Sequence, residues 1–406
     1  MLRPLRSRDY RLFWSGSLIA NLGVWIQTTA LGWLVYNLTR RASLLGTISF
    51  AGNMPILVLG LVGGAIADRA SRRAVMMSSL STISAAALTL ALLTATGHIA
   101  VWHIVAISMV SGAANALFGP SMQAVIPSIV AEGELLNAIS LNSVQFNLAR
   151  TIGPAIAGLA YGVIGPAGCF AMNATGMVVM VLMIARVRIP RAALTVAPPP
   201  VARALREGLA YARVHPVIGP GLLLAAVMSI FGFPYIVLLP ALARDTLGLD
   251  ASGLGYLLAA VGVGAVTGGL AMSAFGDVAR KDLVAGWSAV AFGLVLAGFG
   301  VVRSAHGFAA LLFTMGVLQT ACVASINTMI QLVVHDGMRG RVMSMMTVIL
   351  FGFATAGALL IGLAGDRIGV AQALASGGVV IAIVATAVLA RAATTPRPVE
   401  AGRPVA

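Results

Sequence analysis

Long apolar runs fill most of the chain, and short polar or glycine-rich segments separate them. The runs are continuous and do not alternate in period two, which favours helices over half-buried strands. A helix needs about 20 apolar residues to cross a bilayer, and a spanning segment must satisfy its own backbone hydrogen bonds. The pattern predicts an all-α membrane protein with twelve transmembrane helices, near residues 11–38, 43–67, 74–96, 101–129, 137–163, 167–186, 217–243, 252–276, 283–302, 307–334, 341–364 and 370–390.

The composition points to the same class. Of 406 residues, 59% are hydrophobic and 9% are charged, whereas soluble proteins carry about 25% charged residues. Cys169 and Cys322 lie in separate apolar runs, so we expect no disulfide framework, no metal site and no cofactor. The first apolar run is too long for a signal peptide, and we expect it to remain as the first span.

The net charge of +14 is distributed unevenly along the chain. Most of the 26 basic residues fall at the termini and in one alternate set of predicted loops. The positive-inside rule then places both termini in the cytoplasm and the protein in the plasma membrane, the inner membrane of a bacterium. Because topology and attraction to anionic lipid account for the charge, we expect no nucleic-acid partner.

The longest connection, 187–216, divides the chain into halves. It contains the helix-breaking 197-APPP-200 and then an amphipathic segment, 201–214, expected to lie as a helix on the cytoplasmic membrane surface. The predicted organisation is a six-helix bundle over 1–186, a linker over 187–216, a second six-helix bundle over 217–392 and a cytoplasmic tail over 393–406.

A glycine-containing motif recurs at the ends of four predicted spans. The segments 64-GAIADRAS-71 and 269-GLAMSAFG-276 are offset by 205 residues, and 158-GLAYGVIG-165 and 362-GLAGDRIG-369 are offset by 204 residues. The near-constant offset indicates an internal duplication. The motif occurs in spans of opposite direction, which inverted three-span repeats within each half would produce.

Two of these regions resemble signatures of the major facilitator superfamily. The segment 64-GAIADRASRR-73 resembles its cytoplasmic loop signature, and 153-GPAIAG-158 resembles its antiporter signature. The segments 8-RDYRLFW-14, 127-PSIVAEGELLNAISLNS-143 and 339-RGRVMS-344 resemble the subgroup that contains the enterobactin exporter and drug/proton antiporters. The resemblance implies two pseudo-symmetric six-helix bundles, a monomer, and a small-molecule substrate carried by alternating access.

The loop signature also implies residues that gate the cytoplasmic side. An acid at a helix end can pair with an arginine or with the free amides of a neighbouring helix. The alternative is an ordinary solvated loop that carries positive-inside charge. The candidate gating residues of this loop are Gly64, Asp68, Arg69, Arg72 and Arg73.

Gly153, Pro154 and Gly158 in the predicted fifth span are further candidates for gating. Proline removes a backbone hydrogen bond and can kink a helix, and glycine permits close helix packing. Two interpretations stay open, packing alone and a part in the rocking hinge.

Polar and aromatic residues inside the spans predict a central cavity that is amphipathic rather than charged. For each residue alone, the alternative is a hydrogen bond between helices. The candidate substrate-binding residues besides Arg150 are Asn21, Trp25, Asn115, Gln123, Asn142, Asn147, Phe231, Tyr235, Gln319, Asn327 and Gln331.

Arg150 is the exceptional residue, since it lies near the middle of the predicted fifth span. An arginine at the bilayer centre costs about 2.5–3.5 kcal/mol, so it should face the bundle interior. All twelve acidic residues fall in loops, tails or span ends. Arg150 is therefore bonded to carbonyls and amides or free to bind an anion, and the cavity favours neutral or anionic cargo.

Other classes of protein fit the sequence less well. The single lysine, Lys281, has no phosphate-binding loop around it, and the five histidines form no catalytic or metal motif. We therefore expect a secondary transporter and not an enzyme. It would export amphipathic, drug-like or siderophore-like molecules, coupled to a gradient of protons or another ion. The alternatives are an importer or uniporter of a small metabolite, or a membrane-embedded enzyme or sensor.

Overall fold

The computed structural model describes residues 2–67, 71–131, 133–189, 201–274 and 280–394, and these residues form helices joined by short connections. The α-helices are α1 (Arg8–Thr39), α2 (Ala42–Ala67), α3 (Arg72–Ala95), α4 (Val101–Val125), α5 (Leu135–Ile184), α6 (Val201–Val214), α7 (Ile218–Val227), α8 (Pro234–Ala241), α9 (Ala251–Ala274), α10 (Lys281–Ala297), α11 (Ala305–Val333), α12 (Asp336–Thr347), α13 (Ala354–Ile368) and α14 (Val370–Thr394). Short 3₁₀ segments are η1 (Arg3–Arg6), η2 (Ile126–Ser128) and η5 (Gly298–Gly300).

Eleven helical segments of the described chain are long and apolar enough to cross a membrane. One of them, α5, has 50 residues and contains two spans, because Gly165 interrupts it with φ 66° and ψ −178°. Pro166 follows directly and starts the next run of helix. The break lies between the predicted spans 137–163 and 167–186, so the twelve predicted spans are all present as helix.

Two spans contain π-helical segments that the hydrophobic pattern does not predict. The seventh span runs α7, η3 (Met228–Gly232), α8 and η4 (Leu242–Thr246), and the eleventh runs α12, η6 (Val348–Phe353) and α13. Close packing accompanies the change in winding, since a β-carbon at Gly357 would lie 2.1 Å from the carbonyl oxygen of Ile230. Single π-helical turns inside α-helices often occur at functional sites.

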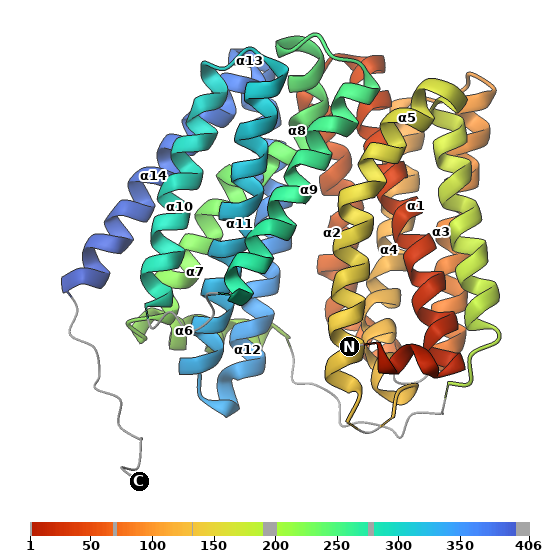
Figure 1. Cartoon of the computed structure of the whole chain (residues 1–406), viewed down its shortest axis with the longest axis horizontal. Coiled ribbons are helices and arrows are strands. Elements are labelled where there is room, and N and C mark those ends of the chain that lie inside the picture. Colours follow the sequence, from red (N-terminus) through yellow and green to blue (C-terminus); the bar gives the residue numbers. More distant parts are fainter. Residues whose placement is uncertain (1, 68–70, 132, 190–200, 275–279, 395–406) are drawn as a thin grey trace.

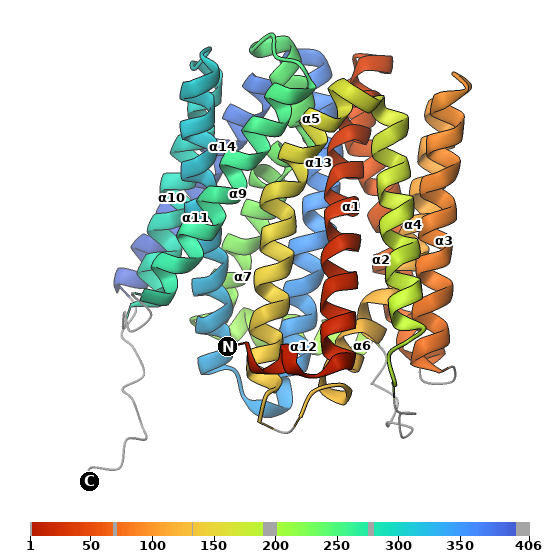
Figure 2. The same cartoon turned by 45° about the vertical axis from the view of Figure 1, so that its right-hand side comes forward.

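The helices form two bundles side by side (Figure 1). In the first bundle α5 packs against α1 and α3, and α2 packs against α4; in the second, α10 packs against α14 and α11, and α9 packs against α11. Figure 2 shows the same two groups from another side. We call the end that carries the start of α1, with α6 and α12, the terminal face, and the other end the opposite face (Figure 1).

The helix α6 covers the residues for which an amphipathic helix was predicted. It packs against α12 at the terminal face. Arg341 on α12 forms an ion pair of 2.9 Å with Glu207 on α6. Gly208 packs closely there, with its β-carbon position 3.4 Å from the carbonyl oxygen of Arg341. The linker helix is therefore attached to the start of the eleventh span.

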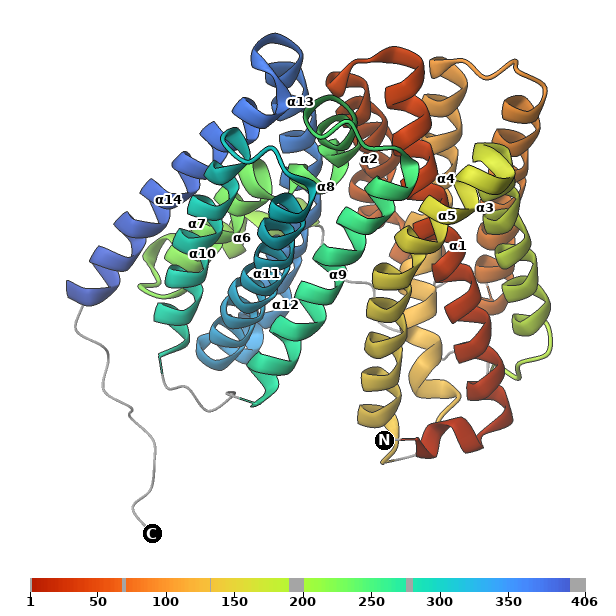
Figure 3. The same ribbon diagram turned by 45° about the horizontal axis from the view of Figure 1, so that its top comes forward.

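Two helix pairs make most of the contacts between the halves, α2 with α13 and α5 with α9. Small residues allow the backbones to approach, since a β-carbon at Gly46 would lie 2.4 Å from the Ala358 carbonyl oxygen. At Gly255 it would lie 2.6 Å from the Pro154 carbonyl oxygen. Figure 3 shows the molecule with its opposite face turned toward the reader. The two bundles lie together at that face and diverge toward the terminal face.

Candidate functional site

Arg150 lies on α5 just beyond the contact between the halves. The neighbouring Thr151 is the residue that α9 approaches, because a β-carbon at Gly262 would lie 2.7 Å from the Thr151 Cα. Arg150 is partly buried, and about 15 residues of helix, roughly 22 Å, separate it from the start of α5. Arg150 therefore lies near the middle of the first of the two spans in α5, beside the contact with α9.

The partner of Arg150 is an aromatic ring. The guanidinium carbon lies 6.0 Å from the centroid of the Trp25 ring on α1, within the range of a cation–π contact. Phe146, one turn earlier on α5, meets the same indole edge-on at a centroid distance of 6.2 Å. Among the described residues Arg150 has no ion pair and no hydrogen bond. Of the two possibilities from the sequence, a bond to carbonyls and amides is not formed in this structure.

In the second half, two predicted site residues are joined to each other, Tyr235 and Gln319. Tyr235 on α8 is fully buried, and its hydroxyl donates to the Gln319 side-chain oxygen on α11 at 3.1 Å. The set of predicted site residues that lie in contact thus consists of two pairs, Arg150 with Trp25 on α5 and α1, and Tyr235 with Gln319 on α8 and α11.

The remaining predicted cavity residues are not joined to this set by any hydrogen bond among the described residues. The amides of Asn115 and Asn147 donate to carbonyls one turn back in their own helices, at 3.0 and 2.8 Å. Gln331 donates to Asn327 on the same helix. Gln123 is exposed, and the partly buried residues are Asn21, Asn142 and Phe231. Their inclusion in a substrate site stays a prediction.

The predicted loop signature is described only in part. Gly64 lies in the last turn of α2, whereas Asp68 and Arg69 lie outside the described residues. Arg72 donates to the carbonyl oxygen of Ala124 at 3.3 Å, and Arg73 donates to that of Ala185. Both carbonyls are at helix C-terminal ends, where a cation is favourable. In this structure the two arginines hold helices of the first half together.

The three residues of the predicted antiporter signature face different neighbours. Gly153 faces α1, because a β-carbon there would lie 2.6 Å from the Trp25 Cβ. Gly158 faces the other half, where its β-carbon position is 2.9 Å from the Ala251 carbonyl oxygen, and the Pro154 carbonyl meets Gly255. The signature therefore positions Trp25 on one side and the α5–α9 contact on the other.

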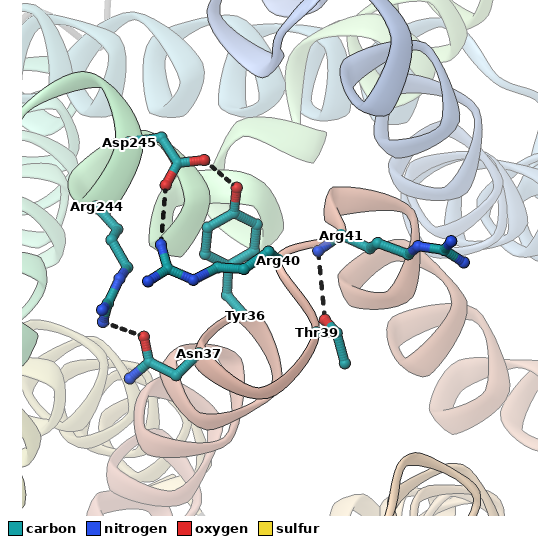
Figure 4. A network of polar contacts seen from close by, with 7 residues as sticks. All are labelled: Tyr36, Asn37, Thr39, Arg40, Arg41, Arg244 and Asp245. Carbon is teal, nitrogen blue, oxygen red and sulfur yellow. Dashed lines mark hydrogen bonds and ion pairs between the residues drawn. The ribbon is translucent and has the colours of Figure 1, made fainter.

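A polar network connects the halves at the opposite face (Figure 4). Asp245 in η4 accepts a hydrogen bond from the Tyr36 hydroxyl and pairs with Arg40 at 3.4 Å. Arg244 donates to Asn37. Arg40 has φ 53°, so it ends α1 in the left-handed conformation. A cavity of about 550 Å³, lined among others by Tyr36, Arg40 and Asp245, lies beside this network.

Reasoning from the sequence missed this network and also Phe146. The sequence pattern indicates only loop or span-end charges at four residues of this face, Arg40, Arg244, Asp245 and Asp366. A sequence signal for Asp366 does exist. The Asp-Arg pair in 362-GLAGDRIG-369 repeats the Asp-Arg pair in 64-GAIADRAS-71. In the described part of the chain no group of three histidine, cysteine or acidic side chains could hold a metal ion.

Several known proteins are similar in sequence. A macrolide efflux protein A from Streptococcus pyogenes is 25% identical over 376 residues, which are 91% of this chain and 93% of that protein. The enterobactin exporter EntS of Shigella boydii is 27% identical over 78% of this chain and 76% of its own. A staphyloferrin A transporter from Staphylococcus aureus is 31% identical over 37% of this chain and 38% of its own.

Solved structures share the fold at low sequence identity. A bacterial homologue of the human lysosomal transporter Spinster, in an inward-facing and occupied conformation, aligns with TM-score 0.77 at 14% identity. The alignment covers 97% of this chain and 98% of that one. The nucleoside transporter NupG aligns with TM-score 0.74 at 13% identity, over 96% and 100% of the two chains.

The family model described as transmembrane secretion effector matches residues 1–400. The match spans both bundles and the linker between them. It agrees with the resemblance to the major facilitator superfamily, with the helical membrane fold and with a transporter rather than an enzyme. This chain belongs to the transmembrane secretion effector family of major facilitator transporters.

Proposed function

We propose that this secondary transporter exports small amphipathic molecules that carry a negative or carbonyl-bearing group. Arg150 would bind that group, and the partly exposed Trp25 would contact the apolar part of the cargo. The relatives named for efflux of macrolides and enterobactin and for transport of staphyloferrin A support export of small molecules.

One observation carries the proposal. The Arg150 guanidinium lies over Trp25 near the middle of its span with no anionic partner among the described residues. Burying a charge without a partner is costly in lipid, so such residues face cavities and mark pathways. A cargo that supplies an acceptor to Arg150 removes this cost. The guanidinium offers a planar fork of donors that suits carboxylate and catecholate oxygens.

The arrangement of the halves supports alternating access with cytoplasmic termini. The cross-half contacts include those at the opposite face, where Asp245 meets Tyr36 and Arg40. They continue inward to Thr151, next to Arg150. With the termini in the cytoplasm, a site at Arg150 receives cargo from the cytoplasm in this conformation. Rocking of the bundles would then expose it outside, driven by a proton or other ion gradient, in a monomer.

Export from cells tests the proposal. Bacteria that express the wild type should accumulate less of a fluorescent amphipathic carboxylate than cells with empty vector. Arg150→Ala should lose at least about 90% of this efflux at equal membrane abundance, since charged hydrogen bonds contribute about 1.5–3 kcal/mol. Arg213→Ala, at an exposed arginine on α6, is the control and should export normally. Higher accumulation in wild-type cells would instead identify an importer.

A further inference from the structure

We propose that Asp366 is a gating residue of the opposite face, which caps helix α2 from the other half and thereby holds the two halves closed there. The proposal rests on alternating access but on no particular cargo or direction of transport. It concerns a residue that the sequence analysis treated only as a charge at a span end.

Helix α2 begins without a capping residue of its own. The first amides of a helix need acceptors, which a Ser, Thr, Asp or Asn at the position before the helix commonly supplies. Here that position is Arg41, which has no acceptor atom in its side chain. Other helices of the chain do supply their own cap, as Ser304 does for α11 by accepting from the Gly307 amide at 3.1 Å.

Asp366 on α13 supplies the missing acceptor. Its carboxylate accepts from the Ala42 amide at 2.6 Å and from the Ser43 amide at 3.3 Å. The Ser43 hydroxyl also donates to the carboxylate. A negative charge at a helix N-terminus adds a favourable interaction with the helix dipole. The first turn of α2 in one half is thus capped by an acid of the other half.

Close packing makes the cap dependent on the position of the halves. Gly362, one turn before Asp366, meets the start of α2, since a β-carbon there would lie 2.8 Å from the Ala42 carbonyl oxygen. Gly46 meets the Ala358 backbone in the same way. If the halves separate at the opposite face, α13 withdraws and the α2 amides lose their acceptor. A cap within one half would survive that motion, so this cap favours the closed arrangement.

The sequence repeats the motif at both ends of this helix pair. Each of the segments 64-GAIADR-69 and 362-GLAGDR-367 begins with glycine and has an Asp-Arg pair that starts four residues later. The second copy lies at the end of α13, at the opposite face, and Gly362 and Asp366 are the copy's packing and capping residues. The Asp366 side chain is exposed to solvent, so water competes with it for the α2 amides. The cap therefore shifts the equilibrium toward the closed arrangement of the halves but does not prevent opening.

A cysteine placed in the contact between α5 and α9 reports whether the whole opposite face opens. Its reactivity is the measured quantity. Ala251, at the start of α9, is 9% exposed and its carbonyl meets Gly158. Ala251→Cys is made in full-length protein in which the buried Cys169 and Cys322 are replaced by alanine. The rate of labelling by a polar maleimide reports the open fraction without any cargo, so the result is independent of the proposed function.

Asp366→Ala should label roughly fivefold faster than the parent, the change expected for loss of one helix cap. Ser304→Ala removes a cap within one half and should label at the parent rate. Arg41→Ser gives α2 a cap of its own, so it should label faster than Arg41→Ala, which removes the same charge without adding an acceptor. This pair decides the matter if Asp366→Ala does not fold. The proposal is overturned if Asp366→Ala labels at the parent rate, or if Ser304→Ala labels as fast as Asp366→Ala. It is also overturned if Arg41→Ser and Arg41→Ala label at the same rate.

Discussion

At the scale of single residues, Arg150 and Trp25 form the centre of the account. An arginine at the bilayer centre costs about 2.5–3.5 kcal/mol, and a cation–π contact returns about 0.5–2 kcal/mol. The Trp25 contact therefore offsets only part of the cost, which leaves Arg150 able to gain from a bound anion. Gly153 keeps this contact possible, because any side chain there would collide with the Trp25 Cβ at 2.6 Å.

Replacement of Trp25 tests the aromatic part of the site. Trp25→Leu should raise the KM for an acidic cargo about two- to thirtyfold, which corresponds to loss of a contact of about 0.5–2 kcal/mol. Trp25→Phe keeps an aromatic face for Arg150, so its KM should lie between those of the wild type and Trp25→Leu. Transport assays in proteoliposomes measure the KM values. Equal KM values in all three proteins would remove Trp25 from the site.

His215 predicts a pH effect at the terminal face. Its Nδ1 accepts from the Val217 and Ile218 amides, each at 3.3 Å, at the start of α7. Burial lowers the pKa of His215 below its usual 6.5, so the folded state favours neutral histidine. This contribution to stability is present above pH 6.5 and is lost as pH falls through the lowered pKa. The Tm should fall more between pH 7 and pH 5 in the wild type than in His215→Asn, whose side chain accepts without titrating.

The sequence made Arg150 and Trp25 candidates because a charge or an indole stands out against an apolar span. It could not pair Tyr235 with Gln319, since they lie on helices whose contact depends on the whole bundle. It also could not distinguish Asn115 and Asn147, which bond to their own helices, from residues that face another helix. Polar side chains inside a span all have the same appearance in the sequence.

At the scale of elements, Gly165 determines that α5 is two spans. Its φ of 66° with ψ of −178° belongs to a region that is essentially restricted to glycine. Gly165→Ala should destabilise the protein by about 1–3 kcal/mol and lower its Tm in detergent. Gly162→Ala is the matched control, because neither position has an atom within 4 Å of an added β-carbon. Equal Tm values for the two variants would contradict the strained turn.

The contact between α2 and α13 gives a second prediction at this scale. An alanine at Gly46 would place its β-carbon 2.4 Å from the Ala358 carbonyl oxygen, a backbone atom that cannot move aside cheaply. Gly46→Ala should therefore open the opposite face and reduce transport about tenfold or more, the effect of roughly 1.4 kcal/mol on the closed state. Gly119→Ala, with open space around it, should transport normally. Normal transport by Gly46→Ala at equal abundance would refute this role.

The hydrophobic pattern was sufficient to predict the helices and the linker helix over 201–214. The pattern did not indicate the π segments η3, η4 and η6, because the choice between α and π winding depends on neighbouring spans. The break at Gly165 was predictable, since glycine and proline stand together between two apolar runs. Helix boundaries were less accurate, as the eleventh span extends over 336–368 rather than 341–364.

At the scale of the whole molecule, the arrangement of charge predicts the orientation in the membrane. Fusion of alkaline phosphatase after residue 394, at the end of α14, should give an enzyme that is inactive in the cytoplasm. Fusion at residue 98, in the loop between α3 and α4 at the opposite face, should give an active one. The reverse pattern of activity would contradict cytoplasmic termini, and it would also invert the proposed direction of cargo entry.

The two-bundle architecture followed from the span count and from the resemblance, but the conformation did not. The sequence is the same in every state of a transporter, so it cannot show which face is closed. Asp245 with Tyr36 and Arg40, and Asp366 with Ala42, are recognisable only once α1, α2, η4 and α13 are placed together. Residues that act by meeting across the two halves are for this reason the ones that sequence reasoning misses.

If Arg150 binds the cargo, a thermal-shift screen of ligands should give different results with and without its side chain. Wild type and Arg150→Ala, purified in detergent, are heated with panels of amphipathic anions, neutral molecules and cations. A ligand at 100 times its Kd adds about 2.7 kcal/mol of stability. Acidic amphipaths should raise the Tm of the wild type and leave that of folded Arg150→Ala unchanged. Equal stabilisation of both proteins by the same ligands would contradict binding of the cargo by Arg150.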